Sequence, residues 1–126
     1  KVKLETIFAK NTAKTGETLR LTAKVVNIEN EDVFNPIALI GIPAGMSLQP
    51  WQLKELKEKN KFAYYEIQDN YLVVYFRHLK ANETKVINLD LKAEFSGKYQ
   101  AGASSAYLYY GAEDKNWQKG VEVVIN

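Results

Sequence analysis

Histidine, cysteine and clustered carboxylates are the side chains that most often perform chemistry in proteins, and this sequence holds few of them. His78 is the only histidine, and the chain has no cysteine. A Ser-His-Asp triad or a histidine-based metal site needs partners that the sequence does not place beside His78. We therefore interpret His78 as a surface or half-buried residue and expect no enzyme activity, no catalytic residue, no metal site and no cofactor.

The acidic residues gather in polar loops. One group is Glu29, Glu31 and Asp32, and another is the pair Glu113 and Asp114. Such loops can bind calcium weakly, but the spacing of an EF-hand is absent from the sequence. Solvated loop charge is the simpler interpretation of both groups.

Aromatic residues offer a different kind of chemistry, because their rings stack on sugars and on protein partners. The chain has eight tyrosines and two tryptophans. The candidates for contact with a partner are Trp51, Tyr64, Tyr65, Tyr107, Tyr109, Tyr110 and Trp117. The tyrosines either form an exposed platform or lie within sheet faces as cross-strand pairs, and the sequence leaves both interpretations open.

The elements that must position these residues are mainly strands. Leu19 to Val25 and Ile87 to Phe95 alternate apolar and polar residues with a period of two, and Asp69-Asn70 is typical of a hairpin turn. The predicted strands are Val2–Ala9, Leu19–Val25, Phe34–Ile42, Phe62–Ile67, Tyr71–Arg77, Ile87–Phe95, Ala106–Tyr110 and Val121–Ile125. We therefore predict an all-β protein, an antiparallel β-sandwich of about eight strands, with residues 1–126 as a single domain.

One stretch departs from the strand pattern. The sequence from Pro50 to Asn60 predicts a short amphipathic helix that begins at the proline and stops at the asparagine. A helix this short is not stable alone in water, so we expect Trp51, Leu53 and Leu56 to pin it to the sheet. Its exposed side is rich in charge, with Lys54, Lys57 and Glu58 as candidates for a protein-docking face.

Composition narrows the partners and the setting. A net charge of +2 is too small to indicate nucleic acid or an anionic membrane as the partner. No apolar run approaches the length of a membrane span. The sequence opens on Lys1 and enters a strand at once, so we expect a domain excised from a larger protein.

The order of these features resembles a known family. The ordered segments are "IGIPAGMSLQP", the helix "WQLKELKEK", the hairpin "FAYYEIQDNYLVVYFRHLKANET", the strand "INLDLKAEF" and "GKYQAGASSAYLYYGAEDKNW". This arrangement is similar to the C-terminal receptor-binding domain, also called the last macroglobulin domain, of the α-2-macroglobulin and complement family. The resemblance implies an antiparallel sandwich with one helix in a crossover.

The resemblance also implies a function for the parent protein. Family members trap proteases: cleavage of a bait region triggers collapse, and a thioester captures the protease in some of them. A chain without cysteine cannot hold the Cys-Gly-Glu-Gln thioester motif, so the resemblance implies a non-catalytic module of a periplasmic or extracellular parent. Its implied partners are neighbouring thioester-type or macroglobulin domains, with proteases reached only through the parent.

The resemblance further bears on the helix. Vertebrate members carry a lysine pair, four residues apart, that binds an endocytic receptor. In register, the second lysine is Lys54 but the first position is Pro50, so the pair is broken. This departure favours a bacterial homologue. The alternative function is a stand-alone carbohydrate- or protein-binding sandwich of a surface or secreted protein, which predicts exposed, coplanar rings among Trp51, Trp117 and the tyrosines.

Overall fold

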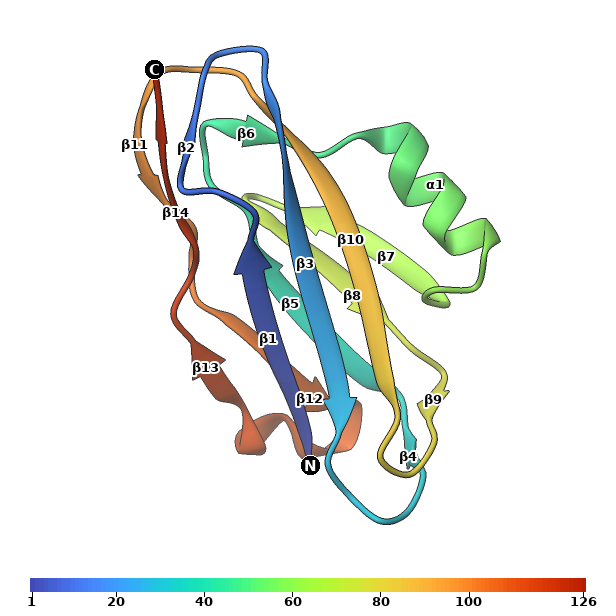
Figure 1. Ribbon diagram of the computed structural model, residues 1–126. Coiled ribbons are helices and arrows are strands. Elements are labelled where there is room, and N and C mark those ends of the chain that lie inside the picture. Colours follow the sequence, from blue (N-terminus) through green and yellow to red (C-terminus); the bar gives the residue numbers. More distant parts are fainter.

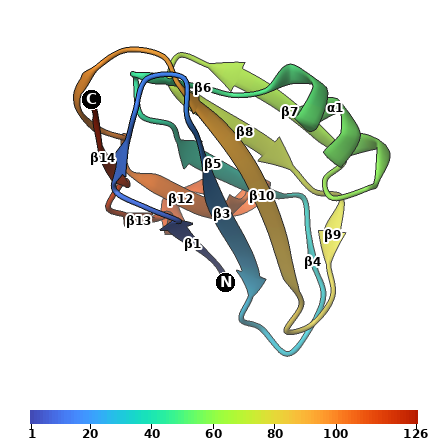
Figure 2. The same ribbon diagram turned by 45° about the horizontal axis from the view of Figure 1, so that its top comes forward.

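The computed structural model describes residues 1–126, except for the side chains at 112–114. The chain folds into two facing layers of β-strands with one α-helix beside them (Figure 1, Figure 2). The acidic pair predicted from the sequence, Glu113 and Asp114, lies outside the residues whose side chains are described. The prediction of an all-β sandwich with one short helix is confirmed.

The first layer is a four-stranded antiparallel sheet in the order β1-β3-β10-β6. Its strands are β1 (Val2–Phe8), β3 (Thr18–Asn27), β6 (Met46–Ser47) and β10 (Thr84–Ala93). In β3, and in β10 from Ile87 onward, every second side chain is buried, and Leu21 lies directly opposite Leu89. The two-residue period seen in the sequence therefore marks the face that this sheet turns toward the core.

The second layer is a five-stranded antiparallel sheet in the order β13-β12-β5-β8-β7. Its strands are β5 (Pro36–Gly41), β7 (Tyr64–Gln68), β8 (Tyr71–Tyr75), β12 (Ser104–Leu108) and β13 (Asn116–Gln118). The predicted hairpin is confirmed: β7 and β8 pair across a turn in which Asp69 adopts a φ of 52°. β5 begins at Pro36, so the proline costs this central strand no interior hydrogen bond.

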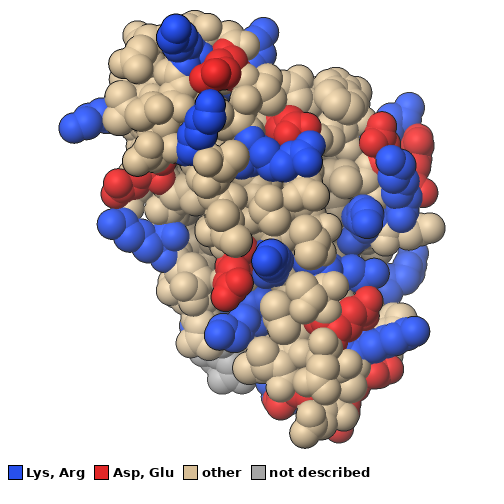
Figure 3. Space-filling model, in the orientation of Figure 1, with Lys and Arg blue, Asp and Glu red and all other residues tan. Residues whose placement is uncertain are grey.

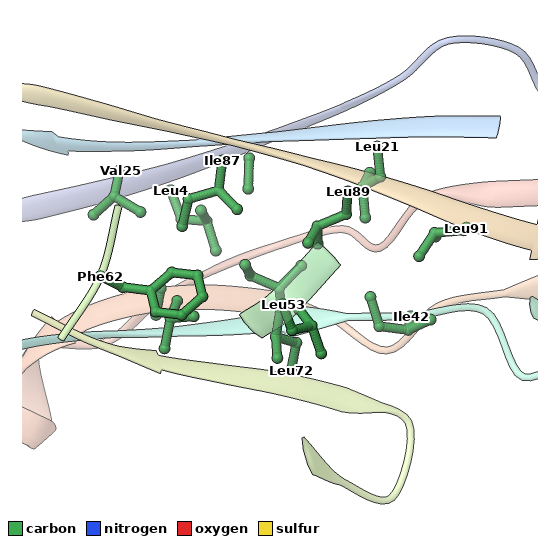
Figure 4. Close-up of a cluster of buried hydrophobic side chains, with 14 of the residues drawn as sticks. Leu4, Leu21, Val25, Ile42, Leu53, Phe62, Leu72, Ile87, Leu89 and Leu91 are labelled. Atoms are coloured by element: carbon green, nitrogen blue, oxygen red, sulfur yellow. The ribbon is translucent and has the colours of Figure 1, made fainter. Parts of the chain in front are cut away.

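Between the layers lies one continuous apolar core. Figure 4 shows Leu89 and Leu21 from the first sheet above Leu72 from the second, with Leu53 of the helix between them. All four side chains are at most 1% exposed. The sheets therefore share a single interior, to which the helix contributes.

Two smaller sheets close the ends of the sandwich. One joins β11 (Gly97–Gln100), β14 (Glu122–Ile125) and β2 (Thr12–Ala13), and the other pairs β4 (Val33–Phe34) with β9 (His78–Leu79). The strands predicted from the sequence include neither β11 nor β2. These strands are short and largely exposed, so they carry little apolar periodicity.

Three predicted strand bounds are wrong for identifiable reasons. The run Phe34–Ile42 divides into β4 and β5 because Asn35 adopts a left-handed φ of 56°. β10 ends at Ala93, which leaves Phe95 exposed rather than in the core. Tyr109 and Tyr110 do not extend β12; they begin the 3₁₀ segment η1 (Tyr109–Asp114).

The helix α1 (Pro50–Glu58) connects β6 of the first sheet with β7 of the second, which confirms its place in a crossover. Pro50 is its first residue, and Asn60 follows its end with a left-handed φ of 59°. In both ribbon views α1 lies at the side of the sandwich where β10 and β7 face each other (Figure 1, Figure 2). It covers a margin that the strands leave open.

Candidate interaction surfaces

The inward side of α1 fixes the orientation of its outward side. Leu53 is buried, Leu56 is partly buried against the core, and Gln52 is buried as well. Trp51 does not pin the helix as predicted, because 59% of it is exposed. The anchoring role assigned to Trp51 belongs to Gln52, which the apolar pattern could not indicate.

Gln52 attaches the helix to β10 through hydrogen bonds. Its Nε2 donates to Asp90 Oδ2 (2.8 Å), and its Oε1 accepts the backbone N–H of Asp90 (2.7 Å). Arg20 of β3 completes the cluster with an ion pair of 3.0 Å to Asp90. The hydrogen bond from Arg20, with a further one from Gln52, holds the pKa of Asp90 below its ordinary value, although burial opposes the shift.

The helix face, formed by Lys54, Lys57 and Glu58, is exposed as predicted for a docking face. Lys57 Nζ lies 5.4 Å from the centre of the Tyr64 ring on β7, a cation–π distance. Lys59 pairs with Glu55 across one helical turn at 3.1 Å. The helix face thus borders the outer side of the five-stranded sheet through Lys57.

That outer side carries a row of large side chains, which we name the aromatic face and define by Tyr64, Tyr75, Tyr107 and Trp117. Tyr64 lies opposite Tyr75, Tyr75 opposite Ile37, and Ile37 opposite Tyr107, so one row crosses four strands. Tyr64 and Tyr75 have ring centres 5.8 Å apart. Trp117 pairs with Ser105, two residues from Tyr107 on the same face of the sheet. The sequence left two interpretations of the tyrosines open, cross-strand pairs and an exposed platform. Tyr64 fits both, because it pairs with Tyr75 across two strands and is more than half exposed.

Charged groups on the aromatic face engage the rings. Lys115 Nζ lies 4.2 Å from the centre of the Tyr107 ring and 5.8 Å from that of Trp117. The Tyr75 hydroxyl donates a hydrogen bond to Glu66 of β7. This bond, with smaller contributions from burial and the Glu66 charge, raises the pKa of Tyr75 to about 12. Burial also raises the pKa of Tyr107.

Tyr109 and Tyr110 continue the aromatic surface at the end of the sheet. Their rings pack edge to face at 4.9 Å, and 84% of Tyr110 is exposed. Tyr110 borders two hollows of about 410 and 290 Å³. The first contains Tyr75 and Ile37 of the aromatic face in its lining, and the second contains Tyr107. The hollows therefore join Tyr110 to the aromatic face.

The structure brings together some of the predicted site residues and separates others. Tyr109 and Tyr110 line a hollow with Tyr75 of the aromatic face, and Trp117 belongs to that face. Trp51 lies on α1, which contacts β10 of the other sheet. Tyr75 and Lys115 are not among the candidates that the sequence predicts. The sequence could have predicted Tyr75, because a hairpin turn at Asp69-Asn70 places it opposite Tyr64.

The residues considered for chemistry remain scattered. His78 is exposed and stacks on Phe34 with ring centres 6.0 Å apart. Among residues 1–111 and 115–126, no three His, Asp or Glu side chains come close enough to hold a metal ion. Within the same part of the chain, no helix has the length and apolarity needed to cross a membrane.

A scan against protein-family models identifies the relatives of this chain. The model for the α-macroglobulin receptor binding domain matches residues 36–119, about two thirds of the sequence. The chain belongs to this receptor-binding-domain family. The matched segment contains α1, the helix face and the whole of the aromatic face. No curated protein sequence matches the chain.

Solved structures agree with this family at the level of the fold. Salmonella α-2-macroglobulin reacted with methylamine superposes with a TM-score of 0.78 at 13% identity, over 99% of this chain and 9% of that protein. The Escherichia coli α-2-macroglobulin fragment from domain MG7 to the C-terminus gives a TM-score of 0.72 at 12% identity, over 99% of this chain and 23% of that fragment. A non-cellulosomal cohesin from Archaeoglobus fulgidus gives a lower TM-score of 0.52 at 13% identity, over 98% of this chain and 86% of the cohesin.

The receptor-binding-domain chain is therefore similar to one small part of much larger proteins. It spans 9% of the Salmonella protein and resembles its C-terminal domain. This supports the context of a multidomain parent.

Proposed function

We propose that this chain is a non-catalytic interaction module of a bacterial α-2-macroglobulin-like protease inhibitor, and that its aromatic face docks on a neighbouring domain of the parent protein. The observation that carries the proposal is the row Tyr64–Tyr75–Ile37–Tyr107 on the outer side of the five-stranded sheet. Family membership supplies the multidomain context.

The aromatic face has the composition of an interface. The solvated face of an antiparallel sheet is ordinarily polar, whereas here more than half of Tyr64 and of Trp117 is exposed beside other rings. Tyrosine and tryptophan are enriched at the centres of protein interfaces and dominate their binding energy. The cations next to the rings, Lys57 and Lys115, are placed to form a polar rim.

The helix face has a secondary place in this proposal. Lys54, Lys57 and Glu58 are exposed, and Lys57 joins them to the aromatic face through Tyr64. We assign the helix face to the rim of the docking surface, where charges steer association more than they add affinity. A receptor site of the vertebrate kind is disfavoured, because Pro50 occupies the first position of the lysine pair.

The trapping of proteases belongs to the parent protein in this proposal. The module would reach proteases only through the parent and supply no reactive group, since the chain has no cysteine for a thioester. A protease inhibitor of this kind acts outside the cytoplasm, so we place the parent in the periplasm or the extracellular space. The first test is the gene itself: an encoded protein without further sandwich domains and a bait-like segment contradicts the proposal.

The docking surface is tested with two pairs of substitutions of similar chemistry. Tyr110→Ser with Trp117→Ser alters exposed rings on the proposed docking side, whereas Phe95→Ser with Trp51→Ser alters exposed rings elsewhere. Calorimetry would measure the binding of this chain to the remainder of the parent, expressed separately. We expect the first pair to weaken binding by about tenfold or more and the second by less than about twofold. Equal effects of the two pairs would refute docking through the aromatic face.

Exposed rings also keep the alternative function open. Trp51, Trp117 and Tyr110 are all more than half exposed, as a carbohydrate- or protein-binding module of a surface protein requires. A glycan array decides for sugars: a specific hit that Trp117→Ser abolishes would favour this alternative over docking within a parent. An array without hits would exclude a carbohydrate-binding function and leave only the protein-binding version of this alternative.

A further inference from the structure

A third surface, separate from the helix face and the aromatic face, lies where the end of α1 meets the corner between β8 and β9. A groove of about 250 Å³ opens there, and we name it the basic groove. It is lined by Asn60, Lys61, Phe62, Ala63, Phe76, Arg77, His78 and Lys85. Three separate parts of the sequence thus supply its walls.

Positive charge dominates the lining. Lys61, Arg77 and Lys85 are cations at neutral pH, His78 lies beside them, and the lining includes no Asp or Glu. Among the described residues, the one carboxylate paired with a lining cation is Glu83, whose Oε2 lies 3.4 Å from Lys85 Nζ. Along the right-hand margin of Figure 3, Lys and Arg side chains occur together with Asp and Glu side chains, so the excess of cations is confined to the lining of the groove. A net charge of +2 for the whole chain makes this local excess distinctive.

The fold holds the cations over an apolar floor. Phe62 and Phe76 are 3% and 5% exposed, so they form a fixed base. The backbone N–H of Lys61 donates to the carbonyl of Leu56 at the end of α1 (3.0 Å). On the other wall, the Arg77 carbonyl accepts the N–H of Asn35 (2.9 Å). The backbone that carries Lys61 and Arg77 is therefore held in place, while their side chains remain exposed.

We propose that the basic groove binds an acidic segment of a protein partner. Carboxylates of the segment would pair with Lys61, Arg77 and Lys85, and an apolar side chain between them would cover the phenylalanine floor. The Glu83–Lys85 pair demonstrates that a carboxylate fits beside one of these cations, and the Arg77 guanidinium can donate two parallel hydrogen bonds to a carboxylate. A free anion would leave the apolar floor uncovered, whereas a peptide fills both parts of the groove.

The basic groove does not depend on the proposed docking through the aromatic face. Its cations, Lys61, Arg77 and Lys85, are not part of the aromatic face or of the helix face, and it requires no protease trapping by the parent. Loss of binding in the groove would leave the proposed function unaffected, and the reverse holds as well.

The test uses the 126-residue chain and a fluorescent glutamate-rich peptide with one central leucine. Anisotropy at low salt measures binding, with the glutamine version of the peptide as its control. We expect saturable binding that weakens as salt rises, because salt screens exposed charges. In a nuclear magnetic resonance titration of the unsubstituted chain, the amide shifts should centre on residues 60–63, 76–78 and 85.

A matched pair of variants assigns the binding to the groove. Lys61→Gln with Arg77→Gln removes two groove cations, and Lys54→Gln with Lys57→Gln removes two cations from the helix face. We expect the first pair to weaken peptide binding by about tenfold or more and the second by less than about twofold. Thermal unfolding of each variant verifies that it folds. If a variant does not fold, the amide shifts of the unsubstituted chain show whether the peptide binds in the groove.

Several outcomes would overturn the proposal. These are the absence of peptide binding, equal losses in the two variants, or amide shifts centred on α1 instead of the groove. Heparin oligosaccharides and vesicles with anionic phospholipid serve as competing ligands. If either binds the groove more tightly than the peptide, a polysaccharide or a membrane replaces a protein segment as the partner.

Discussion

Gln52 bonds Asp90 twice, accepting its backbone N–H at 2.7 Å and donating to its carboxylate at 2.8 Å. This pair joins a helix to the margin of a sheet. β6 pairs with β10 only at Lys92 and Ala93, so the N–H of Asp90 lies beyond the end of β6. The side-chain amide takes the place of a neighbouring strand at that point. It also protects part of a sheet edge, which proteins otherwise guard against pairing with other chains.

The first prediction concerns this contact. Gln52→Ala removes both bonds and leaves the backbone N–H of Asp90 without its partner. We expect the free energy of unfolding to fall by about 1–3 kcal/mol, as measured by urea denaturation. Gln68→Ala is the matched control, because Gln68 is exposed and makes one long hydrogen bond of 3.3 Å. A loss in Gln68→Ala as large as that in Gln52→Ala would contradict the anchoring role of Gln52.

The second prediction compares two apolar residues of α1. Leu53 is 1% exposed and Trp51 is 59% exposed. Leu53→Ala should lower the free energy of unfolding by about 2–5 kcal/mol, because it opens a cavity between the sheets. Trp51→Ala should change it by less than about 0.5 kcal/mol, the usual range for surface positions. Denaturant unfolding of both variants checks the contrast, and a larger loss in Trp51→Ala would restore Trp51 as the anchor.

Leu53 and Trp51 also illustrate what the sequence could predict about the fold. Periodicity and proline placement were enough to place α1 and the long strands, because burial of alternate residues governs both. They could not predict which residues of α1 are buried. The helix lies over the edge of the first sheet, where a polar residue, Gln52, has a hydrogen-bonding partner. That partner is Asp90, 38 residues away, and no local pattern indicates it.

The candidate surfaces follow the same division. Tyr109 and Tyr110 could be named from composition, and the hairpin turn contained enough information to add Tyr75 opposite Tyr64. The basic groove could not be predicted, because Lys61, Arg77 and Lys85 meet only through the packing of three elements. The lysines of the helix are neighbours in sequence, so the charged face that they form could be predicted.

The third prediction follows from the depressed pKa of Asp90, which the Arg20 hydrogen bond lowers most. A carboxyl whose pKa is lowered by folding stabilises the folded state at any pH above its ordinary pKa, which is 3.8 for Asp90. This contribution disappears as the pH falls through the lower pKa of the folded state. Unfolding in urea should therefore become easier below about pH 4. In Arg20→Gln the acid dependence should weaken, and an unchanged dependence would show that other carboxylates cause it.

The fourth prediction concerns Gly41, whose backbone passes close to Gly102. A Cβ at Gly41 would lie 2.1 Å from the Gly102 carbonyl oxygen, which belongs to the backbone and cannot swing aside. Gly41→Ala should therefore lower the free energy of unfolding by about 1–3 kcal/mol through overpacking. The measurement is thermal unfolding, with Gly120→Ala as a second crowded site, 2.0 Å from the Ala101 carbonyl oxygen. Stability equal to the unsubstituted chain in both variants would contradict this packing.

The last prediction uses the hydrogen bond from Tyr75 to Glu66, which raises the pKa of the phenol from 10.0 to about 12. The fold favours the neutral phenol, so its stabilisation is complete below pH 10 and is lost as the pH rises through about 12. Glu66→Gln should bring the titration of Tyr75 to lower pH, as measured by tyrosinate absorbance with Tyr75→Phe as the reference. Tyr107 provides the control, because burial alone raises its pKa and Glu66→Gln should leave its titration in place. If Glu66→Gln moves Tyr107 as much as Tyr75, the substitution has loosened the whole aromatic face, and the specific bond is not the cause.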